Sequence, residues 1–189
     1  MKTGRLEAFS DGVLAIIITI MVLEMKIPQG ASLDTLKPLV PLFLSYVLSF
    51  FYLGIYWNNH HHLFQAANGV NGKILWANLN LLFWLSLFPF VTGWMGENNF
   101  NKNPVALYGI ILLLASLAYK LLIYCILKNE NKNSIVHKAL KKDPKGNFSL
   151  FLYIAGIGIS LYFPKVSLGI YFIVALIWLI PEKRIERIF

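Results

Sequence analysis

Residues 5–23 read RLEAFSDGVLAIIITIMVL, and this stretch decides the fold. It begins with polar and charged residues and continues as an aliphatic run, the pattern of a helix that enters a membrane. Arg5, Ser10 and Asp11 lie where such a helix would begin. Ionisable groups at that depth are costly unless they are paired or face water, so they mark a functional region.

Spacings of three and four residues place one set of side chains on a single face of this helix. The set is Arg5, Phe9, Gly12, Ile16, Ile20, Leu23 and Ile27. A face of large aliphatic side chains fits core packing, lipid contact or the wall of a narrow pore, and the rest of the chain must decide among them.

The composition is that of an integral membrane protein. Of the 189 residues, 57% are hydrophobic and only 14% are charged, whereas soluble domains carry about 25% charged residues. The formal net charge of +8 does not indicate nucleic-acid binding, because the basic residues lie in short segments between apolar runs. Cys125 is the only cysteine, which excludes intramolecular disulfides and a cysteine-based metal cluster.

The apolar pattern predicts an all-α protein with one domain, residues 1–189, and six transmembrane helices. A spanning helix needs about 20 predominantly apolar residues. The predicted segments are residues 5–26, 38–67, 73–96, 104–127, 148–163 and 165–181. The last two are short and are separated by Pro164 and Lys165, so we expect them to form a tight helical hairpin.

Basic residues in the short loops predict the orientation. Most of the 17 lysines and arginines fall on the side that holds both termini, Lys73 and the loop of residues 128–145. Only Lys26, Lys37, Lys102 and Lys165 fall on the other side. Both termini are therefore expected to be cytoplasmic.

Three adjacent histidines, His60 to His62, close the second segment and invite a metal site. Neighbouring residues on a helix point about 100° apart, so they cannot chelate one ion together. Metal-binding histidine pairs prefer a spacing of four. We therefore expect no metal and favour hydrogen bonding within the helix bundle.

The topology brings three polar patches to one level of the membrane: the start of the first helix, the histidines and Asn78. The simplest account is a network in which Ser10 or Asp11, Arg5, Asn78, a histidine (His60 or His61) and the Trp76 indole satisfy one another. A Ser-His-Asp set can be written from these residues. Because nothing predicts a nucleophile elbow or an oxyanion hole, we do not expect an enzyme.

Arg5-x-x-x-Phe9-Ser10-Asp11, followed by Ala15, Ile16 and Thr19, resembles the signature of the transmembrane protein 175 family of endosomal and lysosomal potassium channels. Residues of the second and third segments also resemble the family. They are Tyr46, Ser49, Phe50, Trp57, His60, His61, Leu63 and Phe64, then Trp76, Asn78, Leu79, Leu81, Leu82, Ser86, Pro89 and Phe90. Animal members hold two six-helix units per chain, so this chain is similar to the single-unit prokaryotic form, which assembles as a homotetramer.

The resemblance implies a potassium-permeable cation channel of the inner membrane, with no cofactor besides permeant K⁺ and no obligatory partner besides its own copies. The first helix would line the pore, with Ile16 as the first constricting ring and Ile20 and Leu23 on the next turns. Thr19 would add a hydroxyl ring. An apolar neck of this kind stops ions by dewetting when it is narrow, and its selectivity for K⁺ over Na⁺ should be modest.

Two alternatives remain open. A secondary transporter or other solute carrier usually shows internal repeats and broken helices at mid-membrane, and neither is evident in this sequence. A membrane enzyme that uses His60 to His62 would require a stoichiometric bound metal.

Overall fold

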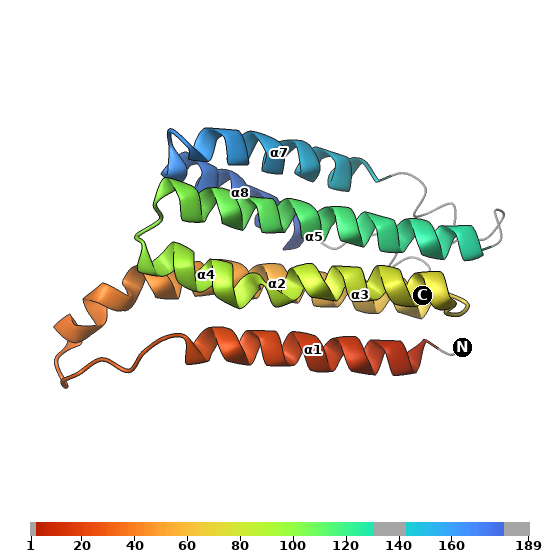
Figure 1. The fold of residues 1–189 in the computed structure, drawn as a ribbon, viewed down its shortest axis with the longest axis horizontal. Coiled ribbons are helices and arrows are strands. Elements are labelled where there is room, and N and C mark those ends of the chain that lie inside the picture. Colours follow the sequence, from red (N-terminus) through yellow and green to blue (C-terminus); the bar gives the residue numbers. More distant parts are fainter. Residues whose placement is uncertain (1–2, 131–142, 180–189) are drawn as a thin grey trace.

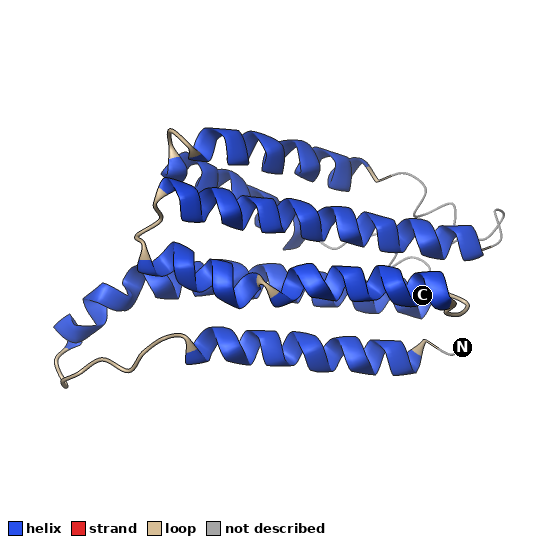
Figure 2. Ribbon diagram, in the orientation of Figure 1, coloured by secondary structure: helices blue, strands red, loops and turns tan. Residues whose placement is uncertain are grey.

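The computed structural model describes residues 3–130 and 143–179. This part of the chain contains helices and no strand (Figure 2), so the all-α prediction is confirmed. The helices are α1 (Gly4–Leu23), the 3-10 helix η1 (Leu33–Leu39), α2 (Val40–Ala66), α3 (Gly72–Ser86), α4 (Phe88–Glu97), α5 (Lys102–Asn129), α7 (Pro144–Ser160) and α8 (Pro164–Leu179). The six predicted segments correspond to α1, α2, α3 with α4, α5, α7 and α8.

The helices run up and down along one axis in four successive layers (Figure 1). Helix α1 forms one outer layer against α2, α3 and α4. Helices α5 and α8 follow, and α7 closes the opposite side. The starts of α1, α3 and α7 and the end of α5 lie together at what we call the N-terminal end of the bundle, and η1 projects beyond the far end.

Four stretches are long and apolar enough to cross a membrane: Gly4–Leu23, Leu33–Ala66, Gly72–Glu97 and Lys102–Asn129. The helix Pro164–Leu179 is apolar but shorter. Helices α7 and α8 pack against each other as the expected hairpin. The predicted end of the last helix at residue 181, the basic tail after it and most of the 128–145 loop lie outside the described residues.

The third predicted segment is broken into two helices, which corrects the expectation of one helix over 73–96. Pro89 has no N–H to donate to the carbonyl of Leu85, and its ring would clash with that carbonyl. The Leu87 N–H instead donates to the Trp84 carbonyl at 3.3 Å, a three-residue step that ends α3. Helix α4 then starts at Phe88 with the proline in its first turn, where a missing N–H costs nothing.

Helix α7 begins at Pro144, four residues before the predicted start at residue 148. Asp143 caps the helix: its Oδ1 accepts from the Gly146 N–H at 2.7 Å. Lys120 of α5 contacts Asp143 and Asn147 and so ties this start to the bundle. Asp143 and Pro144, which we placed in the loop of residues 128–145, therefore form a helix start.

Candidate functional site

A hydrogen-bonded chain of buried side chains joins α2, α3 and α1 near the N-terminal end of the bundle. His60 Nε2 lies 2.8 Å from Asn78 Oδ1, and Asn78 Nδ2 donates to Ser10 Oγ at 3.0 Å. Ser10 Oγ donates in turn to the Leu6 carbonyl at 2.9 Å. All three side chains are at most 2% exposed. Because an amide oxygen only accepts, His60 must carry its proton on Nε2, so every donor in the chain points toward the α1 backbone.

Two further contacts join α1 to α2 at the same level. Trp57 Nε1 donates to Asp11 Oδ1 at 3.0 Å. One turn away, His61 Nδ1 lies 3.8 Å from Glu7 Oε2, which makes an ion pair when the imidazole is protonated. The indole of Trp57 stacks on the His61 ring at 6.2 Å and 14°. Glu7 and Asp11 are four residues apart in the sequence, and so are Trp57 and His61. This matched spacing could have revealed from the sequence that α1 pairs with α2 here.

Arg5 and Trp76 lie outside this network, which corrects the expectation that they belong to it. Trp76 is 75% exposed, and the indole that satisfies Asp11 is that of Trp57. Arg5, Phe9 and Trp76 instead line an open groove of about 400 Å³ between α1 and α3. The network therefore holds α1 by its inner face, and this groove leaves the outer side of α1 uncovered.

The predicted pore residues lie on the face of α1 that is turned away from the bundle. The buried face of this helix consists of Leu6, Ser10, Leu14, Ile17 and Met21. On the opposite face, Ile16, Ile20 and Leu23 are 60%, 40% and 75% exposed. Thr19 lies on this face too, and its hydroxyl donates to the Ala15 carbonyl at 2.8 Å. The bond uses the hydroxyl proton and leaves the oxygen lone pairs available to a cation.

The three adjacent histidines diverge. His60 bonds Asn78, and the Nε2 atom of His61 lies 2.7 Å from Gln65 Nε2. His62 Nδ1 is buried without a hydrogen-bond partner in the described structure. The described residues contain no group of three or more His, Cys, Asp or Glu side chains arranged to hold a metal ion.

Sequence reasoning did not identify a set of hydroxyl groups inside the bundle. Ser49 Oγ lies 2.6 Å from Thr92 Oγ1 and 3.0 Å from the Tyr108 hydroxyl, which joins α2, α4 and α5. The Tyr52 hydroxyl donates to the Tyr171 carbonyl at 2.6 Å and so joins α2 to α8. Single Ser, Thr and Tyr residues in apolar helices carry no periodic signal, so only the packing reveals them.

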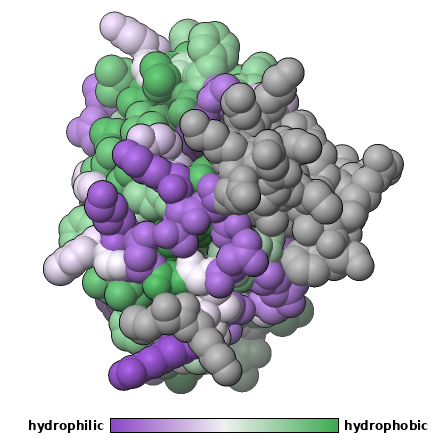
Figure 3. Space-filling view, turned by 90° about the vertical axis from the view of Figure 1, so that its right-hand side faces the viewer, coloured by the Kyte–Doolittle hydropathy of each residue, from purple (hydrophilic) through white to green (hydrophobic). Residues whose placement is uncertain are grey.

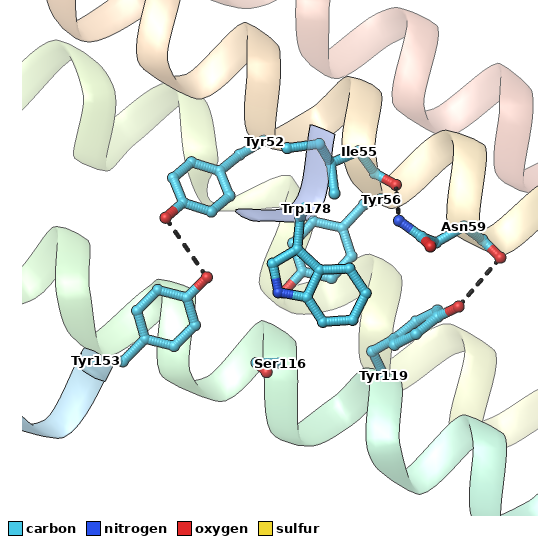
Figure 4. Close-up of a pocket in the computed structure, with 8 residues that line it drawn as sticks. All are labelled: Tyr52, Ile55, Tyr56, Asn59, Ser116, Tyr119, Tyr153 and Trp178. Atoms are coloured by element: carbon cyan, nitrogen blue, oxygen red, sulfur yellow. Dashed lines mark hydrogen bonds between the residues drawn. The ribbon is translucent and has the colours of Figure 1, made fainter. Parts of the chain in front are cut away.

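Of these residues, Tyr52 borders a small cavity of about 30 Å³ on the side of α2 away from α1 (Figure 4). Its lining residues are Tyr52, Ile55, Tyr56, Asn59, Ser116, Tyr119, Tyr153 and Trp178. The Tyr153 hydroxyl donates to that of Tyr52 at 3.5 Å, and the Tyr119 hydroxyl donates to the Asn59 carbonyl at 3.0 Å. A cavity of this size has room for about two water molecules and for no larger ligand.

A family model matches residues 5–89, and its description is endosomal/lysosomal potassium channel TMEM175. The chain is 56% identical to a potassium channel of Chryseobacterium sp. (strain P1-3) over 187 residues, which cover 99% of this chain and 97% of the relative. It is 27% identical to the endosomal/lysosomal proton channel TMEM175 of Gallus gallus over 193 residues, 94% of this chain but 37% of that protein.

The fold also resembles that of a solved structure. The crystal structure of a lysosomal potassium-selective channel TMEM175 homolog from Chamaesiphon minutus aligns with a TM-score of 0.81 at 28% identity. The alignment covers 94% of this chain and 96% of that one. The likeness therefore includes the whole bundle and not only the segment from α1 to α4.

Proposed function

The chain belongs to the family of the endosomal/lysosomal potassium channel TMEM175, and from this membership we propose that it is a potassium-permeable cation channel whose pore is lined by α1. Four copies would surround one axis, with the exposed face of each α1 turned inward. Ile16, Ile20 and Leu23 would then form three successive apolar rings.

The observation that carries this proposal is the exposure of one face of α1. Ile16 and Leu23 are 60% and 75% exposed, although the buried face of the same helix is tightly packed against the bundle. An exposed apolar face could also contact lipid. The surfaces on either side of α1 therefore decide whether this face lines a pore or faces the bilayer.

Exposed aromatic side chains flank α1 on both sides. On α2 they are Phe43, Phe50 and Trp57, and on α3 and α4 they are Phe83 and Phe90. In a cyclic assembly the interface is heterologous, so one flank of each subunit contacts the opposite flank of the next. Two different apolar flanks with α1 between them fit such a ring, in which α1 is the helix nearest the axis.

The proposed rings would act as a hydrophobic gate. Apolar side chains offer no ligands to a dehydrated ion, so a narrow neck excludes ions by dewetting and a slightly wider neck conducts. Thr19 lies between Ile16 and Leu23 on the same face, and its oxygen would be the nearest side-chain ligand for a partly hydrated cation. Selectivity for K⁺ over Na⁺ would then be modest, because few fixed ligands replace the hydration shell.

We further propose that the N-terminal end of the bundle faces the cytoplasm of the cell that carries this protein in its inner membrane. The described basic residues at that end include Lys73, Lys128 and Lys145. Hydrophilic side chains gather on the same end (Figure 3). A positively charged cytoplasmic side is the usual arrangement in multi-pass membrane proteins.

The test is passive K⁺ and Na⁺ flux from liposomes that contain the purified protein, with Ile16→Asn as the diagnostic variant. An amide in the neck favours water there, so we expect K⁺ flux to rise several-fold. Ile154→Asn is the matched control, because Ile154 lies on α7 and is 60% exposed, like Ile16. The control should leave flux unchanged.

Two outcomes would contradict the proposal. Flux that is unchanged in Ile16→Asn but altered in Ile154→Asn would remove α1 from the pore. Flux that saturates and requires a counter-transported ion would favour a carrier over a channel.

A further inference from the structure

An open groove of about 900 Å³ lies between α3 and α5 at the N-terminal end of the bundle. Its described lining residues are Asn71, Gly72, Lys73, Trp76, Ala77, Leu121, Tyr124, Cys125, Lys128 and Asn129. Asn71 Nδ2 donates to Asn129 Oδ1 at 3.0 Å, which joins the start of α3 to the end of α5. The groove is distinct from the proposed pore, because α3 separates it from α1.

The α5 wall of this groove is amphipathic along its length. Leu121, Tyr124 and Lys128 line the groove, and Leu117 continues their stripe one turn beyond it. The four residues follow one another at spacings of four, three and four, and all are exposed. Leu117 and Lys128 are eleven residues apart, which is about 16 Å of helix. One leaflet of a bilayer has a hydrocarbon thickness of about 15 Å. The stripe therefore has the length and the polarity of a phospholipid that stands in one leaflet.

The basic end of the groove carries two lysines and no carboxylate among its described lining residues. Lys128 Nζ lies 5.7 Å from the centre of the Tyr124 ring, so this ring holds the ammonium group at the groove. Among the described residues, Glu130 forms no ion pair with either lysine. Its two carboxylate oxygens accept from the Asn68 backbone N–H at 2.8 Å and from Asn68 Nδ2 at 2.6 Å.

Two exposed aromatic side chains lie at the level of these lysines. Trp76 is 75% and Tyr124 is 59% exposed. Tryptophan and tyrosine concentrate at the boundary between the headgroups and the hydrocarbon, where one part of the ring is apolar and another part forms hydrogen bonds. These rings therefore place the basic end of the groove at headgroup depth.

We propose that this groove binds an anionic phospholipid of the leaflet that faces the N-terminal end of the bundle. Its phosphate pairs with Lys73 and Lys128, its glycerol region lies beside Trp76 and Tyr124, and an acyl chain follows Leu121 and Leu117. Basic grooves between transmembrane helices recognise anionic headgroups in this way. The choice of the cytoplasmic leaflet rests on the proposed orientation, whereas binding itself requires neither conduction nor a particular pore.

The charge and the dimensions of the groove favour lipid over a second copy of the chain. A neighbouring subunit would have to bring acidic groups to Lys73 and Lys128. The exposed α2 flank, which we place opposite α3 in the ring, offers Phe43, Phe50 and Trp57, and the carboxylates beside it, Asp11 and Glu7, already face Trp57 and His61 of their own subunit. An anionic lipid supplies both the charge and the apolar length.

The test is native mass spectrometry of the full-length protein titrated with phosphatidylglycerol or phosphatidylcholine. We expect the wild-type protein to prefer phosphatidylglycerol, and Lys73→Gln/Lys128→Gln to lose at least about tenfold in affinity for it. Lys102→Gln/Lys165→Gln is the matched control, since it removes the same charge from exposed positions at the far end. The control should bind like the wild type.

A second variant tests the apolar part of the site without a change of charge. Leu121→Trp fills the groove and should also weaken phosphatidylglycerol binding, even if the double lysine variant fails to fold. Equal affinity for the two lipids, or an equal loss in both lysine pairs, would overturn the proposal. Displacement of the lipid by inorganic phosphate would assign the site to free phosphate, and dissociation of the assembly by the lysine substitutions would assign it to a neighbouring subunit.

The same samples separate this inference from the proposed function. Ion flux is measured in phosphatidylcholine liposomes, and lipid binding is measured on the protein in detergent. A protein that binds phosphatidylglycerol but conducts no ions would refute only the channel, and one that conducts but shows no lipid preference would refute only the site.

Discussion

Asn78 joins three helices through one amide group. Its oxygen accepts from His60 on α2 and its nitrogen donates to Ser10 on α1, and its side chain is fully buried. A buried amide in a membrane bundle is tolerated only when such partners are present. Asn78 therefore fixes the position of α1 relative to the other helices.

Asn78→Ala should lower the free energy of unfolding by roughly 1–3 kcal/mol, because it leaves the His60 N–H and the Ser10 oxygen buried without this partner. An SDS titration of the purified protein measures this change. Asn80→Ala is the control, since Asn80 is on the same helix and only half-buried. An equal loss of unfolding free energy in both variants would mean that the hydrogen bonds from Asn78 to His60 and Ser10 add no stability.

Sequence reasoning placed Ser10, Asn78 and the histidines at one level, because helix lengths and loop positions set the depth of each residue. It assigned the wrong indole, Trp76 instead of Trp57, and left open which histidine joins Asn78. Those choices depend on how each helix is rotated about its own axis. Rotation follows from packing against neighbouring helices, and periodicity alone does not specify it.

Helices α5, α7 and α8 meet around the ring of Tyr171, which lies in a niche between two glycines. A Cβ atom at Gly109 would lie 2.0 Å from the Tyr171 hydroxyl oxygen, and one at Gly156 would lie 2.5 Å from the ring carbon Cε1. Small residues let transmembrane helices approach closely enough to enclose such a ring.

Gly156→Ala should destabilise the protein by about 1–3 kcal/mol, because the added methyl group forces Tyr171 out of its niche. Gly158→Ala is the control on the same helix, since a Cβ atom there meets no atom within 4 Å. Thermal unfolding in detergent compares the two variants. If both melt like the wild type, the close approach of α7 and α8 is not part of the stable fold.

Element boundaries show where the sequence was informative and where we misread it. The apolar runs identified the four stretches of the described residues that are long and apolar enough to cross a membrane, because hydrophobic length is the dominant signal in a bilayer. The break between α3 and α4 and the start of α7 both depend on a proline: Pro89 interrupts a helix, whereas Pro144 follows a capping aspartate and begins one. Distinguishing these roles required the preceding residue and not the apolar pattern.

At the scale of the whole molecule, the exposed apolar side chains of α1 and those of α7 should meet different surroundings. Leu23 on α1 is 75% exposed and Phe151 on α7 is 66% exposed. Helices α1 and α7 form opposite outer layers of the bundle (Figure 1). In the proposed tetramer the first lines a water-accessible pore and the second faces lipid.

Leu23→Cys and Phe151→Cys, each in a Cys125→Ser background, test this separation with a charged, membrane-impermeant thiol reagent. Thiols react as thiolates, which form readily only in contact with water, so Leu23→Cys should react at least about tenfold faster and lose K⁺ flux on modification. Equal reaction rates at the two positions would contradict a pore along α1.

The tyrosine-lined cavity of Figure 4 lies on the side of α2 away from α1, outside the proposed conduction path. The side chains of Tyr52 and Tyr153 are only 2% and 3% exposed, so water reaches their hydroxyls when the surrounding helices transiently separate. The rate of isotope exchange at the hydroxyls of Tyr52 and Tyr153 after transfer to D₂O would therefore measure how often α5, α7 and α8 separate. That rate would report motion in the half of the bundle that lies away from α1 and, in the proposed tetramer, away from the pore.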